Sequence, residues 1–264
     1  MTATLAPGRR ALVRPPGPRL ADGLVTHLAR SPIDLDRARA QWDGYVAALH
    51  GCGWTTLEVP PADDCPDAVF VEDALVVLDD LAVVARSGAE SRRGETQAAE
   101  QTVRQLGYQV QHVDAPGTLD GGDVLKIGRQ VYVGLGGRTN AAALDQLRTH
   151  FAPLGAEVVG VPVHKVLHLK SAVTALPDGT VIGYLPLVDD ASVFSSFLAV
   201  PEEPGAHVVD LGEGRLLMSV SAPGTAELLA ARGWTPVVVD IGEYERLEGC
   251  VTCLSVRLRG VAGS

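Results

Sequence analysis

Residues 67–86 of the chain read DAVFVEDALVVLDDLAVVAR. Two runs rich in β-branched residues flank a pair of aspartates, a pattern that predicts two strands joined by a turn. Residues 90–106, ESRRGETQAAEQTVRQL, carry apolar residues at three- and four-residue spacing and are expected to form a helix. Residues 108–113, YQVQHV, then read as a third strand. The stretch therefore predicts a strand–strand–helix–strand unit of about 50 residues.

The same order of elements recurs about five times along the chain. Further helices are expected at 34–50, 139–151, near 191–198 and at 224–233. Further hairpins are expected at 121–134, 171–185 and 207–220, and single strands at 10–15, 157–163, 235–241 and 253–258. Several of the hairpins have Asp-Gly or Gly-rich turns, which favours tight connections.

Units of this size cannot bury their own apolar faces, but a closed ring of them can. No linker-like or low-complexity segment separates the units. We therefore expect residues 1–264 to form a single α/β domain. Its strands at about 10–15 and 253–258, one from each end of the chain, should complete the same module.

The formal charge of the 264-residue chain is −10, from 22 basic and 32 acidic residues. This balance argues against a nucleic-acid partner, which needs clustered Lys and Arg, and is compatible with a cationic small molecule. There is no secretory signal pattern and no run of roughly 18 apolar residues, so we expect no membrane association and a cytoplasmic location. The four cysteines do not suggest a disulfide framework.

Three carboxylates, Asp67, Glu72 and Asp73, flank an apolar run in the quoted stretch. If this run is a strand, Asp67 and Asp73 face one side and Glu72 the other. They are either turn acids that bracket a buried strand or buried carboxylates that need a partner. A guanidinium ligand would be such a partner.

Arginines occupy equivalent places before two of the expected helices. Arg92, with Arg86 and Arg93, lies near the start of helix 90–106, and Arg138 precedes helix 139–151, which Thr139 or Asn140 would cap. Cations are slightly disfavoured at a helix N-terminus. Two interpretations remain open: the arginines are solvated, or Arg92 and Arg138 project into the same central space and bind a carboxylate.

Residues 163–173, VHKVLHLKSAV, place His164 and His168 four apart. That spacing can chelate a metal on a helix, but the alternation of Val and Leu favours a strand, and no third ligand is evident. His168 is then a core histidine or a general acid/base. Asp120, in GTLDGGDVL, is at this level an ordinary turn residue.

Cys250 and Cys253 lie three apart in LEGCVTCLSV. No proline separates them, and Cys253 is expected at the start of a strand, unlike a thioredoxin-type motif. Cys52 and Cys65 are thirteen apart and cannot supply the second C-x-x-C of a zinc ribbon. A redox or zinc site is thus disfavoured. Composition alone does not show whether the two cysteines are buried core thiols or include a nucleophile.

Six stretches together resemble the dimethylarginine dimethylaminohydrolase family of the guanidine-modifying pentein superfamily. They are PDAVFVED, RSGAESRRGE, GTLDGGDVLKIG, GGRTNAAA, HLKSAV and LEGCVTCLSV, in the family's order and with similar separations. The resemblance spans about residues 11–258. It implies a five-bladed α/β propeller of ββαβ modules with pseudo-fivefold symmetry, in agreement with the repeat.

The resemblance also implies roles for particular residues. Cys253 falls on the nucleophile, His168 on the general acid/base and Asp120 on the acid that orients the histidine. Seven further residues fall on substrate-binding positions. Glu72 and Asp73 match the guanidinium site, Arg92 and Arg138 the α-carboxylate site, and Asp67 with the backbones of Leu24 and Leu247 the α-amino site. Cys250 is implied to be a bystander.

The implied activity is hydrolysis of asymmetric dimethylarginine and monomethylarginine to citrulline and an alkylamine, without a metal or an organic cofactor. A homo-oligomer is compatible with it. Arginine deiminase is the alternative enzyme, although it generally carries an added helical segment that these repeats lack. Agmatine deiminase, a non-catalytic propeller and a thiol-redox protein are further alternatives. Glu248 and Ser87 depart from the Asp and Pro that many relatives have there.

Overall fold

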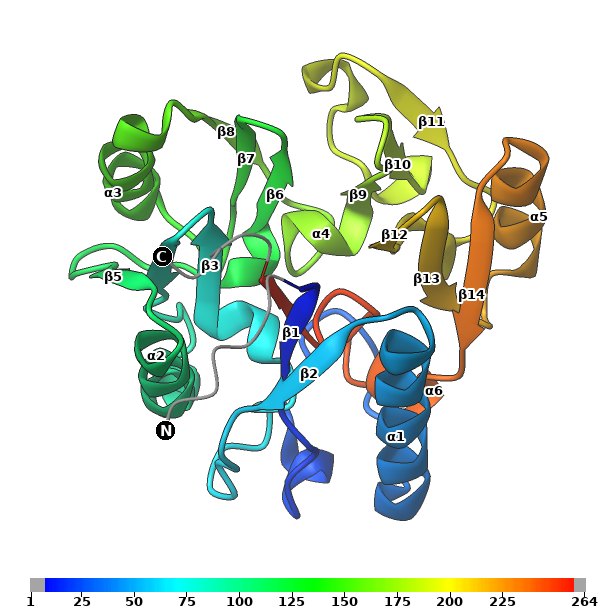
Figure 1. The fold of residues 1–264 in the computed structure, drawn as a ribbon, viewed down its shortest axis with the longest axis horizontal. Helices are drawn as coiled ribbons and strands as arrows, with labels where there is room; N and C mark the ends of the chain where they lie inside the picture. Colours follow the sequence, from blue (N-terminus) through cyan, green and yellow to red (C-terminus); the bar gives the residue numbers. More distant parts are fainter. Residues whose placement is uncertain (1–7, 259–264) are drawn as a thin grey trace.

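The structure, a computed structural model, describes residues 8–258. Five three-stranded sheets surround a common centre, and the long helices lie at the periphery (Figure 1). The five-bladed α/β propeller expected from the sequence is confirmed. Residues 1–7 and 259–264, which we expected to belong to the same domain, lie outside the described residues.

Each sheet has one antiparallel and one parallel pair of strands. The strands, sheet by sheet, are β15 (Val256–Leu258), β1 (Arg10–Val13) and β2 (Thr55–Glu58); β3 (Leu75–Leu78), β4 (Leu81–Val84) and β5 (Gln109–His112); β6 (Val124–Ile127), β7 (Gln130–Leu135) and β8 (Glu157–Pro162); β9 (Val173–Ala175), β10 (Val181–Gly183) and β11 (Phe197–Ala199); β12 (Val209–Gly212), β13 (Arg215–Ser219) and β14 (Thr235–Val239). A parallel pair needs a crossover connection, which explains why a helical segment precedes the third strand of a module.

Four helices make these crossovers, and each was predicted from the sequence, although Glu90–Glu95 at the start of the second form a 3₁₀ helix. They are α1 (Leu35–Gly51), α2 (Thr96–Gln105), α3 (Ala141–Phe151) and α5 (Pro223–Ala231). The Asp34 side chain caps α1 by accepting a hydrogen bond from the backbone of Arg37. Asn140, rather than Thr139, caps α3 in the same way. The short helices α4 (Leu169–Ala172) and α6 (Gly242–Glu245) lie outside these crossovers.

The fourth module departs from the expected pattern. Residues 191–198 do not form a helix: a single 3₁₀ turn, Ala191–Val193, is separated by the bend 194–196 from β11. The Asp190 carboxylate caps this turn through the backbone of Ser192, and Phe197 and Leu198 pair with β10 instead of continuing a helix. Strand β2 was not predicted, because TTLE has only one apolar residue.

Three segments near the expected site are loops or turns rather than strands. Residues 71–74 form a 3₁₀ turn before β3, so the strand assumed for them was wrong, although Asp67 and Asp73 do face one pocket that Glu72 does not line. Residues 163–167 form a loop that ends at His168, the N-cap residue of α4. Cys253 lies in a turn, and β15 begins only at Val256. Short connections next to the strands therefore carry the residues expected at the site.

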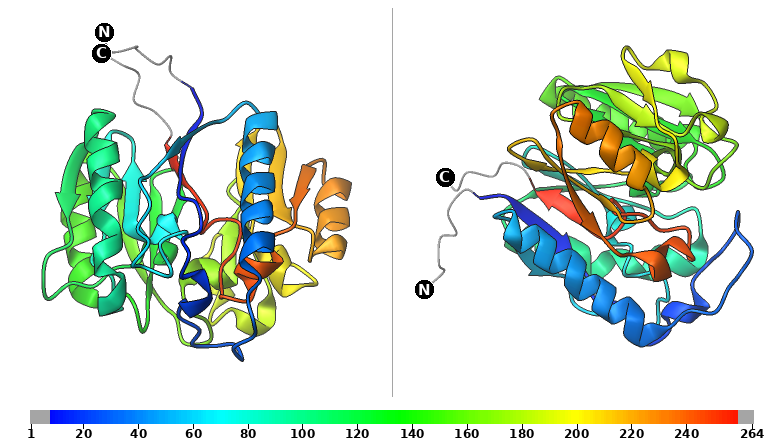
Figure 2. Two further views of the ribbon diagram at one scale, coloured as in Figure 1. Left: turned by 90° about the horizontal axis from the view of Figure 1, so that it is seen from below. Right: turned by 90° about the vertical axis from the view of Figure 1, so that its right-hand side faces the viewer.

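The two ends of the described chain meet in one sheet. Strand β15 pairs antiparallel with β1, with Arg10 opposite Leu258 and Leu12 opposite Val256. Figure 2 shows β1 (dark blue) and β15 (red) side by side from two directions. The first module is thus completed by the last strand, as the sequence predicted.

Apolar side chains are buried mainly between modules. Phe151 and Leu147 of α3, both fully buried, share one cluster with Val76 and Val83 of the preceding sheet. Burying such a side chain stabilises the fold by about 1.5–3 kcal/mol, so each module depends on its neighbour. Among the helices of residues 8–258, none is long and apolar enough to cross a membrane.

Candidate active site

One small cavity brings together residues from six separate segments of the chain. Its free volume is about 20 Å³, roughly the room of one water molecule. We call it the Cys253 pocket, and it is lined by Leu24, Asp67, Phe70, Asp73, Arg92, Arg138, Leu167, His168, Leu247, Glu248, Gly249 and Cys253. Eight of the ten residues predicted for the site line it, and the other two are Asp120 and Glu72.

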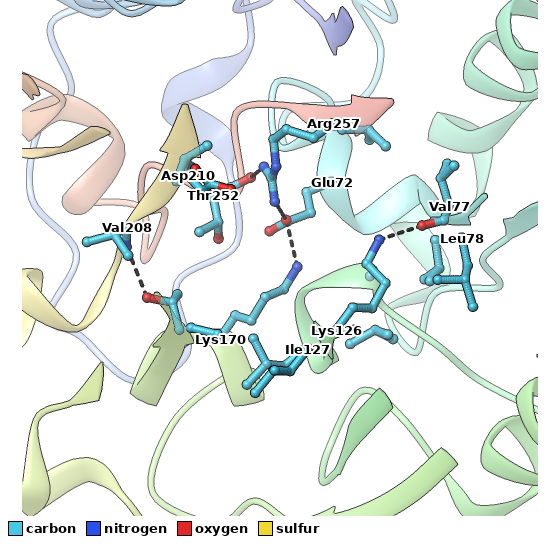
Figure 3. A pocket seen from close by; sticks show the side chains of 18 of the residues that line it. Glu72, Val77, Leu78, Lys126, Ile127, Lys170, Val208, Asp210, Thr252 and Arg257 are labelled. Carbon is cyan, nitrogen blue, oxygen red and sulfur yellow. Dashed lines mark hydrogen bonds and ion pairs between the residues drawn. The ribbon is translucent and has the colours of Figure 1, made fainter. Parts of the chain in front are cut away.

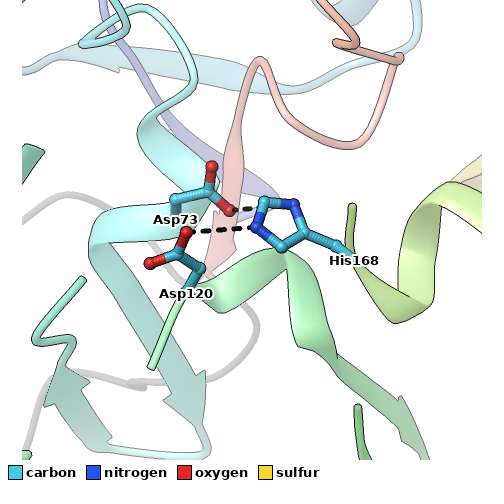
Figure 4. Close-up of side chains that lie close together, drawn as sticks. All are labelled: Asp73, Asp120 and His168. Atoms are coloured by element: carbon cyan, nitrogen blue, oxygen red, sulfur yellow. Dashed lines mark hydrogen bonds and ion pairs between the residues drawn. The ribbon is translucent and has the colours of Figure 1, made fainter. Parts of the chain in front are cut away.

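His168 is held between two carboxylates (Figure 4). Its Nε2 lies 3.1 Å from Asp120 Oδ2, and its Nδ1 lies 4.0 Å from Asp73 Oδ1. An ionised carboxylate only accepts hydrogen bonds, so Nε2 carries a proton and donates it to Asp120. A Cβ atom at Gly122 would lie 2.6 Å from His168 Nδ1 and 2.8 Å from Asp73 Oδ1, which makes glycine necessary there.

The charges around His168 favour its protonated form. Burial by itself lowers the pKa of the imidazole, but Asp73 and the hydrogen bond to Asp120 outweigh it and raise the pKa to about 9. Burial conversely raises the pKa of Asp120, and this is outweighed by His168 and Arg92, so the pKa lies below its usual range. At neutral pH the pair is an imidazolium and a carboxylate, ready to donate a proton into the pocket.

Asp123 is a positioning residue that no sequence signal singled out. Its carboxylate accepts hydrogen bonds from the backbone of Leu169, at 2.9 Å, and from the Thr139 hydroxyl, at 2.6 Å. Complete burial raises its pKa to about 6. These bonds fix the start of α4 and thereby the backbone next to His168.

The Asp73, Asp120 and His168 cluster has ligand atoms close enough to hold a metal ion. Each carboxylate, however, already forms an ion pair with an arginine: Arg92 with Asp73 at 2.7 Å and Arg138 with Asp120 at 3.1 Å. Two guanidinium groups at this range repel a further cation. The donor set therefore fits proton transfer better than metal binding.

Cys253 lies in a turn fixed from several sides. The backbone N–H of Cys253 donates to Cys250 O at 3.1 Å, and the backbone N–H of Glu72 donates to Cys253 O at 3.2 Å. The hydroxyl of Tyr45, on α1, contacts Val251 O at 2.9 Å and Ser255 Oγ at 2.7 Å. The sulfur that lines the pocket is therefore held by α1 and the η2 turn (Val71–Ala74).

The resting thiol of Cys253 is not pre-ionised. The hydrogen bond with Cys250, followed by burial and the nearby carboxylates of Glu72 and Asp73, raises the pKa of Cys253 above its usual range. A cation placed against Asp73 would reverse part of this effect, because an opposite charge stabilises a thiolate. A guanidinium bound at Asp73 would therefore favour ionisation of Cys253.

The two predicted carboxylate-binding arginines are in different states. The Arg92 guanidinium donates to Asp73 Oδ2 at 2.7 Å, to Glu95 Oε2 at 2.8 Å and to Asp67 O at 3.2 Å, and is almost fully occupied by these partners. The three-residue spacing of Glu95 from Arg92 favours this ion pair, but the pair is buried rather than solvated. Arg138 has only Asp120 as a partner among the described residues, so it is the freer of the two cations.

Two residues predicted for an α-amino site, Leu24 and Asp67, lie together at the Cys253 pocket. Leu24 donates its backbone N–H to both oxygens of Asp67, at 3.0 and 3.2 Å. Glu248, flagged as a departure from the usual Asp, accepts hydrogen bonds from the backbones of Thr26, His27 and Leu28. Its longer side chain thus fastens the loop 26–28 to the turn that precedes Cys253.

Glu72 does not project into the Cys253 pocket. Adjacent residues of a 3₁₀ turn point about 120° apart, so Asp73 enters the pocket while Glu72 points elsewhere. Its Oε1 lies 2.6 Å from Lys170 Nζ and 2.8 Å from Arg257 Nη2 (Figure 3). It lines a separate cavity of about 590 Å³, which we call the central cavity. The side-chain contact with a substrate guanidinium predicted for Glu72 does not fit this geometry.

The chain is similar over almost its whole length to a known enzyme. The N(G),N(G)-dimethylarginine dimethylaminohydrolase of Streptomyces coelicolor is 67% identical over 253 residues, which cover 96% of this chain and 98% of that protein. The chain belongs to the dimethylarginine dimethylaminohydrolase family. The resemblance seen in the sequence motifs is confirmed.

Two solved structures of the dimethylarginine dimethylaminohydrolase family match this fold. One, a histidine-to-glycine variant captured as an adduct with S-methyl-L-thiocitrulline, has a TM-score of 0.89 and 32% identity and covers 95% of this chain and 100% of its own. The other, a cysteine-to-serine mutant from Pseudomonas aeruginosa complexed with citrulline, has a TM-score of 0.88 and 32% identity, with 95% and 99% coverage. Residues 58–186, just under half of the chain, also match the model of the RNA-editing substrate-binding complex 5 protein. That match leaves Cys253 outside.

Proposed function

We propose that the protein hydrolyses Nω-methylated arginines, namely asymmetric dimethylarginine and monomethylarginine, to citrulline and dimethylamine or methylamine. One observation carries the proposal: Cys253, His168 and Asp73 line one pocket in a chain of this family. A thiol, a protonated imidazole and a carboxylate are the groups needed to attack a bound guanidinium.

The substrate would span the pocket from Asp73 to its mouth. Its guanidinium pairs with Asp73, its α-carboxylate with Arg138 and Arg92, and its α-amino group with Asp67 and the backbones of Leu24 and Leu247. Because Arg92 occupies Asp73 in the empty site, this binding requires the Arg92–Asp73 ion pair to open. The free volume of about 20 Å³ must also increase, so we infer that the pocket walls move when substrate binds.

In the first half-reaction the Cys253 thiolate attacks the central carbon of the guanidinium. His168 gives its proton to the departing alkylamine, and Asp120 keeps the imidazolium oriented and ionised. General acid catalysis of this kind contributes roughly 10²–10⁴-fold. The product is a covalent thiouronium on Cys253, and the methylated amine leaves.

In the second half-reaction the neutral His168 takes a proton from water, and the resulting hydroxide attacks the thiouronium carbon. The carbon–sulfur bond breaks, which releases citrulline and returns the Cys253 sulfur. His168 ends the cycle protonated, as it began.

The test is to offer asymmetric dimethylarginine, monomethylarginine, arginine and agmatine in parallel and to measure citrulline (carbamoylputrescine for agmatine) and amine. We expect citrulline from the two methylated arginines to exceed that from arginine by far. We expect little turnover of agmatine, which has no carboxylate for Arg138. Citrulline formed chiefly from unmethylated arginine would overturn the proposed substrate.

The pH profile of kcat, which reports the substrate complex, should show the ionisation of His168 and Cys253. We expect a falling limb near pH 9, because His168 loses its proton there and can no longer protonate the amine. The rising limb belongs to Cys253, whose pKa in the complex is lowered by the bound guanidinium, so this limb should lie below the falling limb. Asp120→Asn removes a charge that raises the pKa of His168, so the falling limb should move to lower pH. A falling limb near 6.5, the ordinary pKa of histidine, would contradict the assignment.

Two broader expectations belong to this proposal. We propose that residues 1–264 act as one domain, which is supported by the pairing of β1 with β15. We also propose that the protein works in the cytoplasm on a small molecule, with self-association left to measurement by light scattering.

A further inference from the structure

We propose that Cys250 and Cys253 form a reversible disulfide that withdraws the pocket sulfur from catalysis. Their Sγ atoms lie 3.4 Å apart, and both residues are free thiols in this structure. Cys250 does not line the Cys253 pocket. The Cys253 sulfur therefore lines the pocket, and the Cys250 sulfur contacts it from outside the pocket lining.

The backbone already has a shape that a disulfide accepts. The hydrogen bond from Cys253 N–H to Cys250 O closes a four-residue turn, which brings the first and last Cα atoms within about 7 Å. Disulfides span Cα separations of about 4.4–6.8 Å and need the sulfurs at about 2.05 Å. The backbone therefore need not move: rotation of the two side chains could bring the sulfurs from 3.4 Å to bonding distance.

The surroundings favour reaction between these two sulfurs. The Cys250 N–H points at Cys253 Sγ, 3.4 Å away, and Thr252 Oγ1 lies 3.3 Å from Cys250 Sγ. The hydrogen bond from Cys253, which outweighs burial, lowers the pKa of Cys250, so Cys250 is the more easily ionised sulfur of the pair. A thiolate next to a second thiol is the arrangement in which thiol oxidation ends as a disulfide.

A small oxidant has a way in. Cys253 is 8% exposed and lines the pocket, whereas Cys250 is 5% exposed and lies behind it. The pocket holds about one water molecule, and hydrogen peroxide is only slightly larger. Larger oxidants would be excluded from the pocket, so we propose a small hydroperoxide as the oxidant.

The reaction balances with that single oxidant. One sulfur of the pair, as the thiolate, attacks the O–O bond, which gives a sulfenic acid and one molecule of water or alcohol. The second sulfur attacks the sulfenic sulfur, the S–O bond breaks, and a second water leaves. Two thiols are oxidised by two electrons and one hydroperoxide is reduced. A dithiol reductant reverses the change.

The consequence for activity rests on the proposed function of Cys253, but the disulfide itself does not. With its sulfur bonded to Cys250, Cys253 cannot attack a guanidinium. Without Cys250, a sulfenic acid at Cys253 has no neighbouring thiol and proceeds to sulfinic acid, which dithiols do not reduce. Cys250 thus protects the nucleophile while it switches the enzyme off.

The experiment treats the reduced protein with hydrogen peroxide and reads both peptide mass and turnover before and after dithiothreitol. In the unchanged protein we expect nearly all turnover to be lost, the peptide with Cys250 and Cys253 to become lighter by two hydrogen atoms, and dithiothreitol to restore both. In Cys250→Ser we expect a loss that dithiothreitol does not restore and a peptide heavier by added oxygen. Cys52→Ala, which removes a buried cysteine outside the pocket, should behave as the unchanged protein.

Oxygen added to Cys253 in the unchanged protein, with no disulfide, would overturn the proposal. So would full recovery of Cys250→Ser after the same treatment. If the disulfide forms and reverses but turnover of methylated arginines is absent from the start, the proposed function fails and the disulfide stands, because peptide mass does not depend on activity.

Discussion

Cys253→Ser is expected to lower turnover of asymmetric dimethylarginine by a factor on the order of 10⁴ or more. A serine hydroxyl in this pocket would have to ionise beside Asp73 and Glu72, whose charges already oppose ionisation of the more acidic thiol. The side chain would still fit, so the loss should appear in kcat rather than in folding. Turnover is measured as citrulline formed, and the melting temperature is measured beside it.

Cys250→Ser is the matched control for this loss. It makes the same change of sulfur to oxygen three residues away, on a side chain that does not line the pocket. We expect it to keep most of the turnover under reducing conditions. The reverse pattern, a dead Cys250→Ser and an active Cys253→Ser, would show that the nucleophile is misassigned.

Much of the fold could be predicted because its signals are local. The period-2 and period-3.6 patterns around residues 67–113 gave the module, and Asp34 marked the start of α1 within one residue. The prediction for the fourth module was wrong because the run 191–198 is short, and the pattern of so short a run does not distinguish a helix from a turn followed by a strand. Pairing with β10, a tertiary contact, decided the outcome there.

The site was predictable in its membership but not in its contacts. The motif resemblance named eight residues that line one pocket, and the local pattern placed Asp73 and Glu72 on opposite sides, but nothing local showed which cavity each side faces. That difference follows from a 3₁₀ turn in a stretch whose apolar run favoured a strand. Likewise, the partners of a buried carboxylate such as Asp123 come from segments far away in the sequence.

Buried charge in this site is balanced in the empty state by the protein itself. Arg92 on Asp73 and His168 on Asp120 occupy the carboxylates that would otherwise be buried unpaired, at a cost of several kcal/mol each. Substrate binding therefore exchanges one guanidinium for another at Asp73. Such an exchange lets a cationic substrate enter without leaving an uncompensated charge in the pocket.

His168→Gly is expected to separate the two half-reactions. The Cys253 sulfur and the guanidinium site at Asp73 remain, so attack on the substrate should still occur. The imidazole that protonates the amine and later activates water is gone, which should lower steady-state turnover by roughly 10²–10⁴-fold. A substrate analogue with a leaving group that needs no proton, such as S-methyl-L-thiocitrulline, bypasses the first of these losses. The adduct should then accumulate on Cys253.

The measurement is intact mass after acid quench at increasing times, with peptide mapping to place the added group. We expect His168→Gly to become heavier by the trapped amidino fragment, at Cys253 only, while the unchanged protein shows little adduct at steady state. The double variant His168→Gly/Cys253→Ser should show none, which ties the mass to that sulfur. Normal turnover in His168→Gly would remove the histidine from the mechanism. An adduct on Cys250, whose sulfur lies 3.4 Å from that of Cys253, would instead identify Cys250 as the nucleophile.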